Sequence, residues 1–202
     1  LFQFAGASRF AYNWALDRQM ANYYAGRKLQ SDCELRREFT KFRNTGEATW
    51  LLEVSNNVTK QAIKDLCISY RNFFRKQKKT GYVKFSPKKL TVYDMNGHPK
   101  FRSKKNGDFS FYQDNMKIQF MNTHVKLESI ADSKRRNRQR ANWVRLAEKG
   151  RIPIDGKYTN PRITFDGENW WLFSEGIGID LGIKDLAITS DSDKVRNINK
   201  TN

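Results

Sequence analysis

The sequence is poor in cysteine, and it contains no long hydrophobic run. It has two cysteines, Cys33 and Cys67, without a CxxC pair, and two histidines, so we predict no structural zinc site. No stretch of 18 apolar residues occurs, so no segment is expected to span a membrane. No secretory signal is visible, and we therefore expect both thiols to be buried in a protein of the reducing cytoplasm.

Acidic residues are also scarce relative to basic ones. The 202 residues include 38 Lys and Arg but only 21 Asp and Glu, which gives a formal net charge of +17. Such an excess repels itself and is best explained by a polyanionic partner. Aromatic residues make up 13% of the chain, whereas disordered basic tails lack them, so the composition indicates a folded basic protein.

The first part of the chain has helical periodicity. Phe10 and Trp14 recur at helical spacing, which predicts a helix over residues 8–24 and a second helix over 34–43. The longest helix is predicted from Asn56 to about Lys79, with Ser55 or Asn56 as its N-cap. Its apolar stripe is expected to pack in a helix bundle, and its basic face is expected to contact phosphate rather than only water.

Residues 75–105 hold eleven basic residues and one acid. Glycine and proline interrupt the second part of this segment, and tyrosine and phenylalanine are interleaved with the cations. Cations and aromatic rings on an irregular segment suit a nucleic-acid backbone with unstacked bases. A mobile surface loop is the alternative.

Residues 109–175 carry short alternating runs rich in aromatic and β-branched residues, separated by turns such as Asp166-Gly167. This pattern predicts a small antiparallel barrel or sandwich. The basic run at 134–140 interrupts it, and a short helix is expected over residues 141–148. The basic run is either a solvated face or, in this composition, a contact for RNA phosphates.

Two apolar runs near the end of the chain flank Gly182, and each has the length of a strand. Asp180 lies inside the first run. A carboxylate among apolar residues loses hydration unless a cation or hydrogen bonds replace the water. Asp180 therefore either caps the turn or binds a metal ion.

The run "GIDLGIKDLAI" that contains Asp180 resembles the first motif of a RuvC-type nuclease in the version found in the TnpB family. "WLLEVSNN" and "NPRITFDGENWW" are similar to segments of the same family. TnpB proteins are transposon-encoded RNA-guided DNA nucleases related to the type V CRISPR effectors. The resemblance implies an α+β fold: a helical recognition domain (1–79), a basic connector (80–108), a wedge β-barrel (109–175) and the start of an RNase H-like RuvC domain (176–202).

The resemblance also implies site residues, cofactors and partners. Asp180 would be the catalytic Mg²⁺ ligand, and a zinc ribbon is expected only from later segments. A target-adjacent DNA motif would be read by Asn56, Asn57, Lys60, Tyr112 and Gln113. Guide RNA and DNA phosphates would be bound by Arg75, Lys78, Lys79, Lys100, Arg102, Lys104, Lys105, Lys134, Arg135, Arg136, Arg138 and Arg140.

The expected function is the N-terminal portion of a Mg²⁺-dependent, RNA-guided DNA endonuclease, with one protein copy per guide RNA. The expected location is the bacterial cytoplasm, in association with the nucleoid and not with a membrane. Asp180 alone cannot hold two metal ions, and the family supplies a glutamate and a second aspartate from later segments. Two alternatives remain: a nuclease-dead, RNA-guided repressor and a non-catalytic, basic RNA-binding module.

Overall fold

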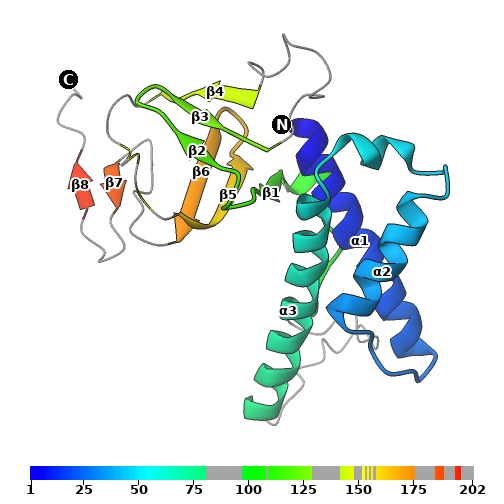
Figure 1. The fold of residues 1–202 in the computed structure, drawn as a ribbon. Helices are drawn as coiled ribbons and strands as arrows, with labels where there is room; N and C mark the ends of the chain where they lie inside the picture. The colour runs from blue at the N-terminus through cyan, green and yellow to red at the C-terminus, as the bar shows by residue number, and fades with distance from the viewer. Residues whose placement is uncertain are drawn as a thin grey trace.

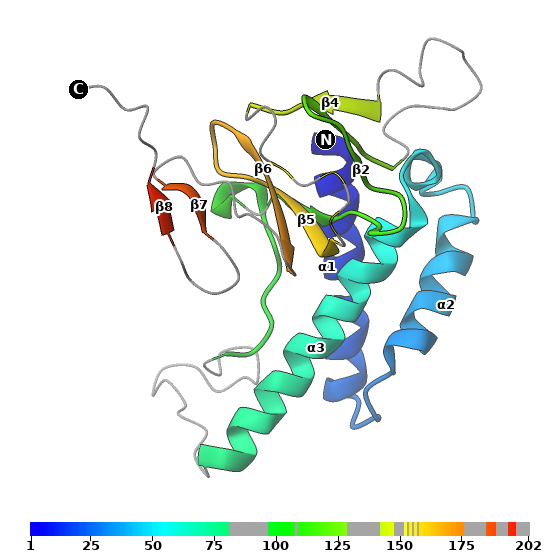
Figure 2. The ribbon, with the colours of Figure 1, turned by 60° about the vertical axis from the view of Figure 1, so that its left-hand side comes forward.

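The computed structural model describes residues 1–80, 97–107, 109–128, 142–147, 152, 154, 156, 158–175, 185–188 and 194–196. The described residues form an α+β fold, which confirms the predicted class. The helices lie together on one side and the strands on the other, and the lower half of α3 extends beyond the sheets (Figures 1 and 2).

The helical part consists of α1 (Phe2–Tyr24), α2 (Asp32–Arg43), the 3-10 helix η1 (Thr49–Glu53) and α3 (Asn56–Thr80). Helix α1 packs closely along α3 because alanines line the buried face of α1: Ala5, Ala7, Ala11 and Ala15 are all fully buried. Small side chains let two helix backbones approach, while Leu16, Ile63 and Leu66 fill the remaining space.

Local capping explains where α2 and α3 begin. The Ser31 hydroxyl accepts a hydrogen bond from the Glu34 amide (3.3 Å), and the Glu34 carboxylate accepts one from the Ser31 amide (2.7 Å), which forms a capping box. These bonds lower the pKa of Glu34. The Ser55 hydroxyl accepts from the Asn57 amide (3.2 Å), so the predicted cap at Ser55 is confirmed.

The predicted start of α1 at residue 8 was too late, because contacts distant in sequence order its first two turns. The Phe2 ring lies edge-on to three aromatic rings of the sheet region, at 5.6 Å from Phe109, 5.1 Å from Phe165 and 5.0 Å from Trp170. The Phe4 ring lies 5.4 Å from Phe111. These contacts place the first residues of α1 against the strands, as both ribbon views show (Figures 1 and 2).

The strands form two three-stranded antiparallel sheets and a separate hairpin. One sheet has the order β1-β5-β6, the second has the order β2-β3-β4, and the hairpin pairs β7 with β8. The strands are β1 (Ser110–Tyr112), β2 (Gln119–Phe120), β3 (His124–Lys126), β4 (Trp143–Arg145), β5 (Thr159–Phe165), β6 (Trp170–Glu175), β7 (Asp185–Ile188) and β8 (Lys194–Arg196).

Two predictions for this region were wrong. Within the described residues the sheets do not close into a barrel, because no strand of the first sheet pairs with a strand of the second. The helix expected around Val144 is instead β4, where Val144 pairs with Val125 of β3. The alternation of Trp143, Val144 and Arg145 fits a strand, and their pairing partners on β3 decide the conformation.

One hydrophobic core joins the helices to both sheets. Buried residues of α1 and α3 form a continuous cluster with Phe111 and Ile163 of the first sheet and with Phe120 and Val125 of the second. A bidentate ion pair adds a polar connection between the two parts. The guanidinium of Arg162 on β5 donates to both carboxylate oxygens of Asp65 on α3, at 2.8 and 2.9 Å.

The cysteines differ from the prediction. Cys33 is exposed on α2 and accepts a hydrogen bond from the Arg36 guanidinium (3.3 Å), so its predicted burial was wrong. Cys67 is half-buried on α3, and desolvation raises the pKa of its thiol to about 11. Within the described residues, no helix is long and apolar enough to cross a membrane.

Candidate nucleic-acid interface

The N-terminal end of α3 meets the end of β1 at a polar junction. The Asn57 side-chain amide donates to the Asp114 carboxylate (2.8 Å) and lies 3.3 and 3.4 Å from the two carboxylate oxygens of Glu128. Lys117 forms an ion pair with Glu128, and this bond raises the pKa of Lys117. Glu128 is itself only 8% exposed, so the junction holds a buried carboxylate with two donors.

The predicted motif-reading residues surround this junction. Asn56, Asn57, Lys60 and Tyr112 are half-buried, and Asn57 bonds to Asp114, the neighbour of Gln113. The side chain of Gln113 is only 1% exposed, and its amide nitrogen has no hydrogen-bond partner in the structure. In this conformation Gln113 faces inward, whereas Asn56, Lys60 and Tyr112 retain some solvent contact.

A basic cleft lies between α2 and α3, next to Lys60. It has a volume of about 470 Å³ and is lined by Cys33, Arg36, Arg37, Thr40, Lys41 and Lys60. Arg36 is paired with Asp32 at 2.8 Å, which fixes its position on α2. The residues on α2 were not among the predicted contacts, although the closely spaced Arg36, Arg37 and Lys41 were a visible signal. The described residues that line the cleft include four cations and no acid, which suits phosphate groups.

The 97–107 segment of the basic connector is held against α1 and α3. His98 is buried between the rings of Tyr70 (5.2 Å) and Phe73 (5.3 Å), and its Nδ1 is 2.8 Å from the Pro99 carbonyl oxygen. The Asn13 side chain exchanges two hydrogen bonds with the backbone of Arg102, at 2.8 and 2.9 Å. This part of the connector is therefore anchored rather than a free loop.

These anchors place the predicted phosphate-binding residues of the connector on the surface. Lys100, Lys104 and Lys105 are exposed, and the Arg102 guanidinium covers the Tyr12 ring at 3.8 Å. Arg75 is exposed on α3. Lys78 and Lys79 lie on α3, but their side chains are outside the described part of the structure, as are the residues of the basic run: Lys134, Arg135, Arg136, Arg138 and Arg140.

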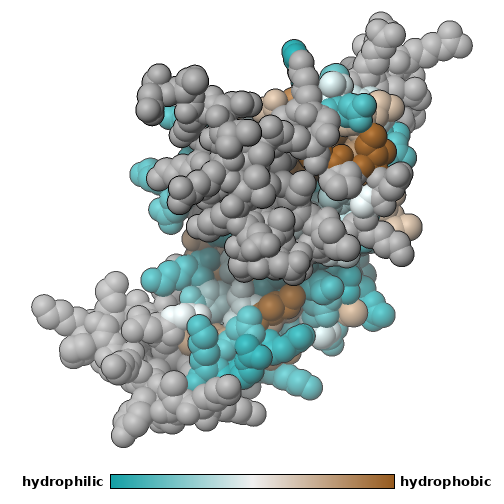
Figure 3. Space-filling model, turned by 90° about the vertical axis from the view of Figure 1, so that its left-hand side faces the viewer, coloured by the Kyte–Doolittle hydropathy of each residue, from teal (hydrophilic) through white to brown (hydrophobic). Residues whose placement is uncertain are grey.

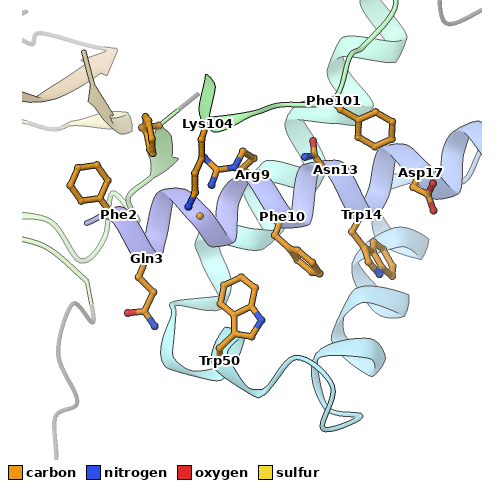
Figure 4. A pocket seen from close by; sticks show the side chains of 12 residues that line it. Phe2, Gln3, Arg9, Phe10, Asn13, Trp14, Asp17, Trp50, Phe101 and Lys104 are labelled. Carbon is orange, nitrogen blue, oxygen red and sulfur yellow. The ribbon is translucent and has the colours of Figure 1, made fainter. Parts of the chain in front are cut away.

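A groove along α1 was not predicted at all. It has a volume of about 880 Å³ and lies between the 101–104 segment and Trp50 of η1, as Figure 4 shows. Its lining is rich in aromatic residues and includes the cations Arg9 and Lys104. Over the described residues, the face shown in Figure 3 is mostly hydrophilic, with small, separate hydrophobic areas.

The predicted catalytic residue Asp180 lies outside the described residues. Among the residues that are described, no group of three or more His, Cys, Asp or Glu side chains could hold a metal ion. The strand β7, which contains the second half of the Asp180 motif, pairs with β8 as an antiparallel hairpin.

Comparisons with known proteins agree with this combination of a helical unit and a basic surface. A family model described as a helix-turn-helix domain, HTH_OrfB_IS605, matches residues 1–28, which form α1 and part of the turn after it. The match shows a similarity to helix-turn-helix domains at the start of the chain and does not reach α2.

Two curated relatives align with almost the whole chain. "Putative RNA-guided DNA endonuclease InsQ" of Escherichia coli (strain K12) is 24% identical over 203 residues, which cover 94% of this chain and 43% of the relative. "Putative RNA-guided DNA endonuclease" of Streptomyces pristinaespiralis is 23% identical over 206 residues, covering 95% and 44%. The chain thus spans less than half the length of these relatives. These similarities support the resemblance of the sequence to the TnpB family.

Proposed function

We propose that this chain is the N-terminal, nucleic-acid-binding portion of an RNA-guided DNA endonuclease. The observation that carries the proposal is the alignment of 94–95% of the chain with two relatives of that name. The formal charge of +17 supports it, because guide RNA and target DNA are both polyanions.

The described surfaces suggest separate sites for phosphate binding and for base recognition. The basic cleft between α2 and α3 would hold phosphates of the duplex that flanks the target. Lys60 lines this cleft and also belongs to the predicted motif-reading set, so phosphate binding there would bring the duplex to the start of α3. Asn56, Asn57, Tyr112 and Gln113 would then discriminate between base edges, because amide groups can pair with adenine.

The buried junction at Asn57 has a defined part in this proposal. The Asn57 side-chain amide already donates hydrogen bonds to Asp114 and Glu128. Asn57 would therefore either position the end of β1 or exchange these partners before it contacts a base. Substituting Asn57 or Gln113 should change which flanking sequence is accepted. Equal loss on every flanking sequence would assign both residues a positioning role.

The catalytic part of the proposal depends on Asp180. As the first acid of a RuvC-type motif, it would bind Mg²⁺ together with acids from later segments of the longer protein. The metal would supply activation of the attacking water and stabilisation of the leaving oxygen. The role of this chain would be to fix the Asp180 carboxylate on a strand and to deliver the bound nucleic acid to it.

RNA co-purification tests the binding part. The chain should purify with RNA, and its affinity for RNA should fall steeply as the salt concentration rises, because phosphate contacts release counterions. Neutralising Arg135, Arg136 and Arg138 together should weaken RNA binding and leave the melting temperature nearly unchanged. A chain that carries no extractable RNA and binds none at low salt would contradict the proposal.

A further inference from the structure

The groove along α1 is lined in part by Gly6, where the helix carries no side chain. Gly6 lies within the second turn of α1, where glycine is an unfavourable residue because it weakens a helix relative to alanine. A Cβ atom added at Gly6 would meet no atom within 4 Å, so packing does not require the glycine. A bare helix surface in an open groove lets a ligand approach the backbone closely.

Two cations stand beside this bare floor. Arg9 and Lys104 line the groove together with Gly6, and in Figure 4 the two cationic side chains extend into the same part of it. The Arg9 guanidinium lies 5.5 Å from the centre of the Phe109 ring, which holds it at the edge of the groove. Two like charges at one place favour an anion between them.

The walls of the groove carry exposed aromatic rings. Trp50 on one wall is 38% exposed, and its ring lies 5.5 Å from the Phe10 ring in a T-shaped arrangement. Phe101 on the opposite wall is 40% exposed. Among the described residues that line the groove, Asp17 is the one acidic side chain, and it lies away from the two cations (Figure 4).

We propose that the groove along α1 binds an unpaired nucleotide of a single-stranded nucleic acid. Arg9 and Lys104 hold its phosphate, the backbone at Gly6 allows close approach of the sugar, and the base stacks on Trp50, with Phe101 available to the next base. A volume of about 880 Å³ is sufficient for a nucleotide. The charge of the cationic end complements phosphate, and aromatic stacking accepts any base.

The inference rests on the proposed nucleic-acid binding but adds a site to it. Duplex DNA keeps its bases stacked and paired, so it cannot present one to Trp50. The groove should therefore distinguish single strands from duplexes, whereas the basic cleft between α2 and α3 should not. The strand is RNA or DNA, because both offer a phosphate and a base.

Two variants test the groove without disturbing the core. Gly6→Leu fills the floor, and it should keep or raise the melting temperature because leucine favours a helix and no neighbour is close. Phe101→Ala removes an exposed ring. Phe173→Ala is the matched control, because Phe173 is 39% exposed and lies on β6, outside the groove.

Binding is measured by fluorescence anisotropy with labelled oligouridylate and oligothymidylate of about ten nucleotides, a length within the range that one binding module covers. A duplex of equal length is measured alongside. Gly6→Leu and Phe101→Ala should each weaken single-strand binding by about tenfold, the effect of losing one stacked base, and should leave duplex binding unchanged. Phe173→Ala should match the wild type.

Photocrosslinking adds a positive readout. A 5-bromouracil base in either single strand should crosslink to Trp50, and Gly6→Leu should abolish that crosslink. A larger loss on one oligonucleotide identifies the natural strand as RNA or DNA. If the wild type binds single strands and both groove variants bind them equally well, the groove assignment is wrong. If the wild type binds no nucleic acid, both the groove assignment and the proposed function are wrong.

Discussion

At the scale of single residues, one amide connects the helices to the strands. The Asn57 amide donates to Asp114 and lies beside both oxygens of Glu128, while Lys117 balances part of their charge. An amide is needed at this position because it can donate a hydrogen bond without adding a negative charge. A carboxylate of the same shape would place a third negative charge beside the two acids.

We therefore expect Asn57→Asp to lower the free energy of unfolding by about 1–3 kcal/mol, and by more than Asn57→Ala does. The alanine variant removes the hydrogen bonds but adds no charge, so it isolates the electrostatic part of the effect. Urea denaturation at neutral pH measures both variants. An aspartate variant as stable as the wild type would show that the acids do not depend on the amide.

His98 is a second residue with a measurable role, because folding lowers its pKa. Burial between Tyr70 and Phe73 lowers its pKa below 6.5, and its hydrogen bond to the Pro99 carbonyl opposes part of that shift. The folded state therefore favours the neutral ring. Its contribution to stability is complete above pH 6.5 and is lost as the pH falls through the lowered pKa of the folded state.

The unfolding free energy of the wild type should thus decline as the pH falls below about 6.5, with His98 contributing at most about 1.4 kcal/mol per pH unit. His98→Gln should reduce this dependence because it removes the titrating group. His124→Gln, which leaves His98 in place, should retain the wild-type slope. Identical slopes in all three proteins would mean that other groups cause the decline.

At the scale of elements, the Asp65–Arg162 ion pair holds α3 against β5. Its two hydrogen bonds are 2.8 and 2.9 Å long, and the side chains are 15% and 31% exposed. Arg162→Lys keeps the charge but loses the bidentate geometry, so it should lower the free energy of unfolding by about 1–2 kcal/mol. Arg71→Lys, at an exposed position of α3, should change it by less than about 0.5 kcal/mol.

A double-mutant cycle separates the ion pair from general effects of each substitution. Asp65→Asn combined with Arg162→Lys should lose less stability than the two single variants added together, because the second change removes an interaction already broken. Strict additivity would mean that the two side chains do not stabilise each other. Chemical denaturation of the four proteins provides the data.

The elements also show what the sequence could predict. The beginning of α3 was predictable because Ser55 acts on a neighbouring residue, whereas α2 begins at Asp32, two residues before the predicted start. The strand β4 was not predictable, because its pairing with β3 depends on residues far away in the sequence. The early start of α1 depends likewise on Phe2 meeting rings more than a hundred positions away.

The same distinction applies to the site. Charge, aromatic content and the Asp180 motif predicted a nucleic-acid partner from local patterns, whereas the groove between Trp50 and Lys104 exists only after the chain folds. The inward orientation of Gln113 was equally hidden, because a glutamine beside a strand is more often on the surface. The chemical character of local segments could therefore be predicted from the sequence, whereas their positions in the fold could not.

At the scale of the whole molecule, the proposed function requires a binding unit and a cutting unit in one protein. The contacts proposed for guide RNA and target DNA lie in residues 1–175, whereas the proposed catalytic carboxylate, Asp180, follows them in the chain. Binding and cleavage should consequently be separable by mutation. Removing a shared metal ligand costs cleavage, since a loss of about 4 kcal/mol of transition-state stabilisation slows a reaction about a thousandfold.

The most direct test is guided cleavage by the longer protein that contains this chain, with its guide RNA and Mg²⁺, compared between the wild type and Asp180→Ala. The account predicts that the wild type cuts a matched target, and that Asp180→Ala binds the same RNA and target but produces no detectable cleavage. Cleavage by Asp180→Ala at a rate close to that of the wild type would contradict the account.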